Sequence, residues 1–132
     1  MTGTMPTPMT AYLRVTGSLV RGPLGVVLAI AFLGGTSALT GRAGLAVASA
    51  WVLMSGTYCV LNFWHCRETH CVVTGLGWTP LGLVGLAVAA LPATPLSWHE
   101  WWELVVAAYL VILTAGFTLQ CAVAARTGRR CL

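Results

Sequence analysis

Two histidines and two cysteines lie within seven residues of one another, in the segment NFWHCRETHCVVTG at residues 62–75. A histidine precedes a cysteine twice in this segment, as His65-Cys66 and as His70-Cys71. Thiolate sulfur and imidazole nitrogen are the donors that bind zinc, copper(I) and other thiophilic ions. An arginine between the two pairs favours the thiolate, the form of cysteine that binds a metal. The segment therefore predicts a binding site for a soft metal ion.

The same four residues also have a simpler interpretation. Histidines are common where a helix meets water, and cysteines are often buried as small, inert side chains. Their concentration in a chain so poor in polar groups favours the functional interpretation, although the spacing is not that of a zinc finger. The sequence leaves two geometries open. Cys66 and His70 share one face if a helix continues past Trp64, whereas a loop would let all four side chains converge.

The three remaining cysteines extend the metal hypothesis. Cys59 lies seven residues before Cys66, two helical turns earlier on the same face, and is a further candidate ligand. Cys121 and Cys131 lie near the C-terminus and are candidate relay positions, because thiols can pass a soft ion on by ligand exchange. Taken alone, Cys59 and Cys121 are more typical of packed core residues, and Cys131 of a passive thiol in the tail.

Composition places this chemistry in a membrane protein. Of the 132 residues, 58% are hydrophobic and 8% are charged, whereas a soluble domain carries about 25% charged residues. The positive charges are all arginines, and basic residues beside apolar segments usually determine membrane topology. We therefore expect the lipid bilayer, and no nucleic acid, as a partner. The expected localisation is the cell inner (plasma) membrane, as a multi-pass protein.

Four segments approach the roughly 20 apolar residues that cross a bilayer. They lie at residues 23–40, 43–64, 72–91 and 98–125. Ser97 and Glu100 have the spacing of a capping box, which predicts that a helix begins directly after Ser97. The predicted fold is all-α, an integral membrane four-helix bundle.

The remaining segments give domain boundaries and orientation. Residues 1–22 form an N-terminal tail with a candidate interfacial helix, residues 23–125 the transmembrane domain, and residues 126–132 a basic C-terminal tail. Four spans put both termini on one side of the membrane, together with every arginine except Arg42. The positive-inside rule then places the N- and C-termini and the segment at 62–75 in the cytoplasm.

Small and polar residues within the spans predict how the helices pack. Helices in lipid associate where small residues let their backbones approach closely. The glycines expected at such contacts are Gly34, Gly35, Gly44, Gly56, Gly77, Gly82, Gly85 and Gly116. The polar side chains expected to hydrogen-bond between helices are Thr57, Asn62, Thr114 and Gln120. The membrane core contains no ionised side chain, which argues against a proton relay.

Two resemblances bear on function. The stretch CRETHCVVTG resembles a group of small, largely uncharacterised prokaryotic membrane proteins that share the pattern Cys-x-x-x-His-Cys-x-x-Thr-Gly. In this chain the pattern is Cys66, His70, Cys71, Thr74 and Gly75. The chain is also similar to the small multi-pass mercuric-ion uptake proteins, which are short, cysteine-bearing helical bundles that pass Hg(II) inward between thiols. That likeness implies Hg(II) as the ion, but the vicinal cysteine pair of those families is missing, since no cysteine precedes Cys59.

Together these features predict a small inner-membrane carrier or binder of a soft metal ion, with Hg(II) first and Cu(I) or Zn(II) next. No catalytic residue or other cofactor is expected. One alternative is a thiol–disulfide oxidoreductase that uses Cys66 and Cys71, although the pair lacks Cys-x-x-Cys spacing and faces a reducing compartment. Another is a non-catalytic subunit of a larger membrane complex, or a homo-oligomer. Transport or binding is thus favoured over catalysis.

Overall fold

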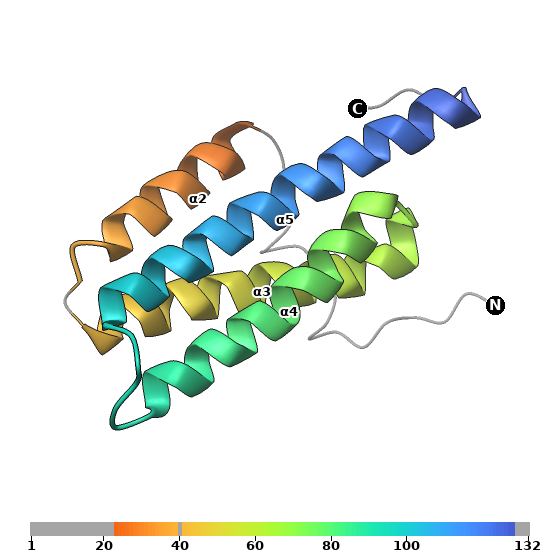
Figure 1. Ribbon diagram of the computed structural model, residues 1–132. Coiled ribbons are helices and arrows are strands. Elements are labelled where there is room, and N and C mark those ends of the chain that lie inside the picture. The colour runs from red at the N-terminus through yellow and green to blue at the C-terminus, as the bar shows by residue number, and fades with distance from the viewer. Residues whose placement is uncertain (1–22, 40, 129–132) are drawn as a thin grey trace, which may run out of the picture.

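The computed structural model describes residues 23–39 and 41–128, and there the chain is helical with short connections (Figure 1). Its helices are α2 (Pro23–Thr36), α3 (Arg42–Cys66), α4 (Thr69–Ala90) and α5 (Trp98–Thr127). Successive helices run antiparallel, and α4 packs against both α3 and α5 (Figure 1). The predicted N-terminal tail with its candidate interfacial helix lies outside the described residues, as do residues 129–132 with Cys131. The side chains of His65 and Cys66 also lie outside them. The predicted C-terminal tail starts later than expected, because Arg126 and Thr127 belong to α5.

Helices α3, α4 and α5 are each long enough and apolar enough to cross a membrane. They correspond to the predicted spans at 43–64, 72–91 and 98–125, with ends that differ by at most three residues.

The capping box before α5 is confirmed. The Ser97 hydroxyl accepts the backbone N–H of Glu100 at 3.2 Å, and the Glu100 carboxylate accepts the backbone N–H of Ser97 at 2.7 Å. The all-α prediction is therefore confirmed.

The first helix is shorter than predicted. α2 ends at Thr36, and its 14 described residues extend about 21 Å at 1.5 Å per residue, less than the roughly 30 Å of a bilayer core. The hydroxyls of Thr36 and Ser37 donate to the carbonyls of Leu33 at 2.7 Å and Gly34 at 2.5 Å. These bonds satisfy carbonyls that a longer helix would use, and the chain turns at residues 37–39. The described part of α2 is thus too short to be the expected span at 23–40.

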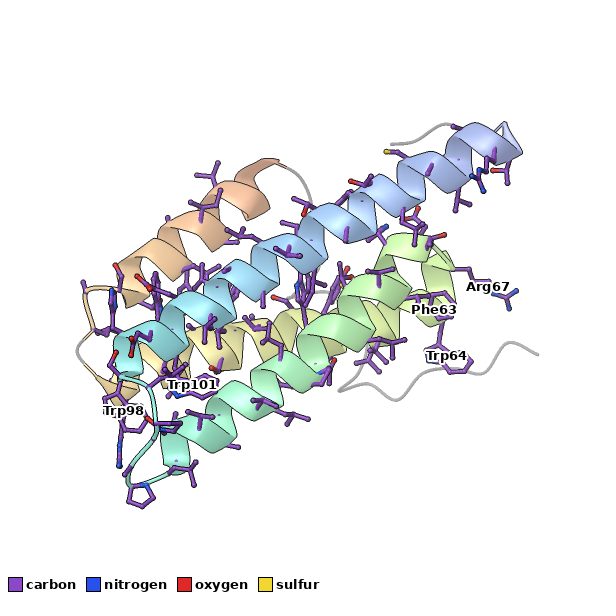
Figure 2. The ribbon with its side chains drawn as sticks, viewed as in Figure 1. Phe63, Trp64, Arg67, Trp98 and Trp101 are labelled. Atoms are coloured by element: carbon purple, nitrogen blue, oxygen red, sulfur yellow. The ribbon has the colours of Figure 1, made fainter. Side chains whose placement is uncertain are left out.

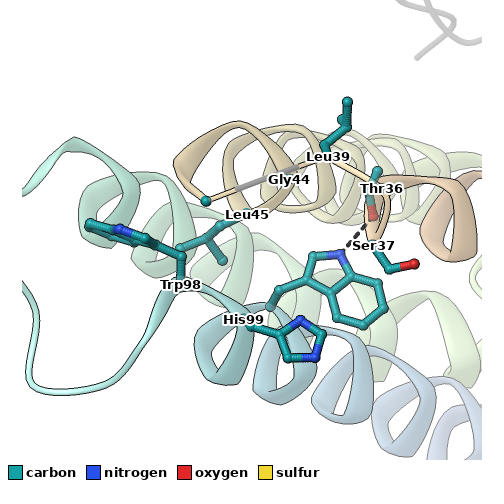
Figure 3. Close-up of a pocket in the computed structure, with 9 residues that line it drawn as sticks. Thr36, Ser37, Leu39, Gly44, Leu45, Trp98 and His99 are labelled. Atoms are coloured by element: carbon teal, nitrogen blue, oxygen red, sulfur yellow. Dashed lines mark hydrogen bonds between the residues drawn. The ribbon is translucent and has the colours of Figure 1, made fainter.

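Aromatic side chains join α2 to the start of α5. The Trp102 indole N–H donates to the Thr36 hydroxyl at 2.7 Å (Figure 3). Beside this bond, a cavity of about 210 Å³ lies between the α2–α3 turn and the first turn of α5 (Figure 3). At the same end of the bundle, the Arg42 guanidinium donates to the Pro92 carbonyl at 2.8 Å and lies 5.0 Å from the ring centroid of Trp98. Trp98 and Trp102 therefore contact residues of α2 and α3.

Glycine allows α3 and α4 to approach so closely that their backbones touch. A Cβ atom on Gly82 would lie 2.5 Å from the backbone nitrogen of Leu53, and one on Gly56 would lie 2.5 Å from that of Thr79. Close contacts with another helix confirm the packing role expected of Gly56, Gly77, Gly82, Gly85 and Gly116. Gly44 instead lies against the carbonyls of Thr36 and Leu39 at the α2–α3 turn. Within the described part of the chain, a Cβ on Gly34 or Gly35 would meet nothing within 4 Å.

Replacement of Gly82 tests this packing. Gly82→Ala should lower the free energy of unfolding by about 1–3 kcal/mol, because the new methyl group forces the two helices apart. Gly34→Ala is the matched control, since the same methyl group enters open space and alanine has the higher helix propensity. The measurement is circular dichroism of the detergent-purified protein during titration with a denaturing detergent. Equal losses in the two variants would contradict the packing described here.

Candidate metal site at the α3–α4 connection

The connection between α3 and α4 consists of only two residues. Arg67 takes a left-handed conformation, with φ 49° and ψ 31°, and its N–H donates to the Phe63 carbonyl at 2.9 Å. Glu68 is extended, and its carbonyl accepts the N–H of Cys71 at 3.1 Å. Figure 2 shows Phe63 and Arg67 at the end of the bundle opposite Trp98.

This short connection changes where the predicted ligands lie. α4 begins at Thr69, three residues earlier than predicted, so His70 and Cys71 belong to its first turn rather than to a loop. Cys66 is the last residue of α3. Neither geometry considered from the sequence is therefore correct, because Cys66 and His70 lie on two different helices and no loop holds all four residues.

The imidazole ring of His70 is held between α4 and α5. The Gln120 amide oxygen accepts the backbone N–H of His70 at 3.3 Å and also contacts ring atom Nδ1. A Glu68 carboxylate oxygen lies 3.1 Å from the same nitrogen. The ring of Phe117 stacks on the imidazole, with centroids 5.2 Å apart and planes 9° from parallel. Three contacts, from Gln120, Glu68 and Phe117, thus fix the orientation of the ring.

These contacts determine which nitrogen of a neutral His70 carries the proton. The backbone N–H of His70 can only donate, so the Gln120 atom that faces it must be the amide oxygen. That oxygen can only accept, as can the Glu68 carboxylate, so Nδ1 must be the protonated nitrogen. Nε2 then presents its lone pair on the other side of the ring.

The thiol of Cys71 lies opposite this lone pair. Its sulfur is 3.4 Å from His70 Nε2. With the ring proton on Nδ1, the S–H of Cys71 is the donor and Nε2 the acceptor. The Asn62 side-chain amide of α3 donates toward the same sulfur at 3.9 Å. Cys71 is only 2% exposed, whereas the His70 side chain is 21% exposed. Cys71 is therefore buried, whereas part of the His70 ring can be reached from outside.

The other candidate ligands are distributed as follows. Cys59 is buried on α3, three residues before Asn62, and like Cys71 it is a thiol rather than half of a disulfide. Cys121 is exposed on α5 and is disulfide-bonded. Among residues 23–39 and 41–128, no group of three His, Cys, Asp or Glu side chains is arranged to hold a metal ion. The described ligand set is thus the pair His70 and Cys71.

The polar residues of the long helices make two kinds of hydrogen bond. Asn62 and Gln120 reach between helices as predicted. The hydroxyls of Thr57 and Thr114 donate to carbonyls three and four residues earlier in their own helices. Sequence reasoning did not pair Gln120 with His70, since fifty positions separate them and only the packing of α5 on α4 joins them.

Comparison of the chain with protein-family models, with curated proteins and with solved structures finds no match. The interpretation of the site therefore depends on its own geometry.

Replacement of Gln120 tests the assigned proton position. Nitrogen-15 NMR of labelled protein at a pH where the ring is neutral should show His70 as the Nδ1–H form. Gln120→Leu should shift the population toward the other form, because one of the acceptors at Nδ1 is lost. Gln120→Glu keeps an acceptor and should retain the parent spectrum. A parent ring protonated at Nε2 would show that the assignment is wrong.

Proposed function

We propose that this chain is a small multi-pass membrane protein that binds a soft metal ion at His70 and Cys71 and carries or relays it. The observation that supports this most is the 3.4 Å separation of the His70 Nε2 lone pair and the Cys71 sulfur. An ion bound there would replace the thiol proton that the two atoms now share.

The surroundings of the pair support the same proposal. Histidines that bind metals usually donate their second ring N–H to a carboxylate or carbonyl, which orients the ring and makes the ligating nitrogen more basic. Here Gln120 and Glu68 occupy that position at Nδ1. The Asn62 amide, which donates toward sulfur, would stabilise the thiolate that remains when the proton leaves.

Two donors leave coordination positions for others. The nearest in the sequence are His65 and Cys66, directly before the connection. Cys59 is buried in the bundle about one helical turn before Asn62. It would be the next thiol along α3 for an ion that moves from the site toward the middle of the bundle. Cys131 remains a relay candidate in this proposal, and Cys121 becomes one when its disulfide is reduced.

The distribution of charge supports a cytoplasmic position for the site. Arg67 and Arg126 lie toward the end of the bundle that holds His70, whereas Arg42, Glu100 and Glu103 lie toward the other. By the positive-inside rule the end with more arginines faces the cytoplasm. We therefore propose the inner membrane as the location, with the metal pair at its cytoplasmic surface.

Variants of the pair test metal binding directly. Cys71→Ser and His70→Gln should each lower the affinity for Zn(II) at least tenfold, since each removes one of the two described donors. His99→Gln is the matched control, because His99 also pairs with a carboxylate, that of Glu103 at 3.3 Å, but lies at the opposite end of the molecule. Titration of the purified protein against a chromophoric chelator gives the affinities. Parent-like binding in both pair variants would refute the proposal.

Cysteine labelling in intact cells tests the orientation. Ala93, in the α4–α5 connection, and Thr127, at the end of α5, are both exposed. A membrane-impermeant maleimide should label Ala93→Cys in intact cells but label Thr127→Cys only after permeabilisation, because the two positions lie on opposite sides of the membrane. The parent protein reports the background from its own cysteines. The reverse pattern would place the metal pair outside the cytoplasm.

A further inference from the structure

We infer that the pair of His70 and Cys71 selects a tetrahedral divalent ion of the zinc type over the linear ions Hg(II) and Cu(I). This inference rests on the proposed function and names the class of ion that the site takes. It differs from the order expected from the sequence, in which Hg(II) came first.

The separation of the two donor atoms carries the argument. Zinc binds thiolate sulfur at about 2.3 Å and imidazole nitrogen at about 2.0–2.1 Å, so donors at a tetrahedral angle are about 3.5 Å apart. The Cys71 sulfur and His70 Nε2 are 3.4 Å apart. With bonds of similar length, a linear ion would need its two donors about 4.3 Å apart. The observed separation therefore matches the tetrahedral arrangement.

The surrounding contacts prevent the pair from opening to the linear separation. His70 cannot swing away without leaving the Gln120 oxygen and the face of Phe117. Cys71 is 2% exposed, and its sulfur accepts from the Asn62 amide of α3 at 3.9 Å. A movement of nearly 1 Å at either side would thus break contacts between α4 and its neighbours.

The binding step balances without a redox change. The Cys71 S–H loses one proton to solvent, its sulfur and the Nε2 lone pair bind the ion, and Nδ1 keeps its proton. The thiolate and the Glu68 carboxylate at Nδ1 together offset the two positive charges of the ion. Water completes the coordination.

Metal titrations of the purified full chain in detergent test the inference. Zn(II), Co(II), Hg(II) and Cu(I) are titrated separately into the parent, His70→Gln, Cys71→Ser and Gln120→Leu, with His99→Gln as the control. Co(II) should give the intense visible bands of a tetrahedral thiolate site. Zn(II) and Co(II) affinities should fall at least tenfold in His70→Gln and in Cys71→Ser. In Gln120→Leu they should fall by roughly 10–100-fold, as is usual when the partner of a ligating histidine is lost.

The titrations with Hg(II) and Cu(I) separate a failure of this inference from a failure of the proposed function. If these ions bind through thiols alone, their affinities should not change in His70→Gln. The inference is overturned if Hg(II) or Cu(I) depends on both His70 and Cys71 while Zn(II) and Co(II) depend on neither, and the proposed function then survives. If no ion depends on either residue, the proposed function fails as well.

Discussion

The close approach of α3 and α4 is the constraint on which the rest of the structure depends. Helices in lipid gain little from burying apolar side chains, so they associate where small residues allow their backbones to touch. Gly56 and Gly82 provide such contacts on opposite sides of one interface. Because the helices are already this close, two residues suffice to join them, and the first turn of α4 lies beside the last turns of α3. Asn62 of α3 consequently reaches the sulfur of Cys71.

The position of α5 follows from the same kind of contact. A Cβ on Gly116 would lie 3.1 Å from a methyl group of Thr74, so the glycine lets α5 approach the first turns of α4. One turn further along α5, Gln120 then contacts both the backbone and the ring of His70. The packing of α5 on α4 therefore places one of the two acceptors that face Nδ1 of His70.

Local patterns in the sequence were enough to predict the three long helices. Their apolar length and the Ser97–Glu100 pair are read within a single segment, and both are observed. The predicted end of α2 was less accurate, because side-chain hydroxyls there bond to backbone carbonyls of the helix. Thr36 and Ser37 end α2 before residue 40 because their side chains bond to carbonyls of the preceding turn.

For the candidate site, the sequence indicated residue types but not their arrangement. The sequence identified His70 and Cys71 as candidate ligands, and they lie together. It could not show that Arg67 takes a left-handed conformation, which is uncommon outside glycine, and so it could not separate Cys66 from His70. Nor could it identify Phe117 and Gln120 as the residues that hold the ring, because those contacts exist only once α5 has packed on α4.

X-ray absorption at the zinc edge of the metal-loaded protein tests the central claim most directly, because it measures the bonds themselves. If His70 and Cys71 bind the ion, the spectrum should contain a sulfur shell at about 2.3 Å and an imidazole shell at about 2.0–2.1 Å. The imidazole contribution should diminish in His70→Gln, and the sulfur contribution in Cys71→Ser. A spectrum of oxygen donors alone, unchanged in both variants, would contradict a metal site at this pair.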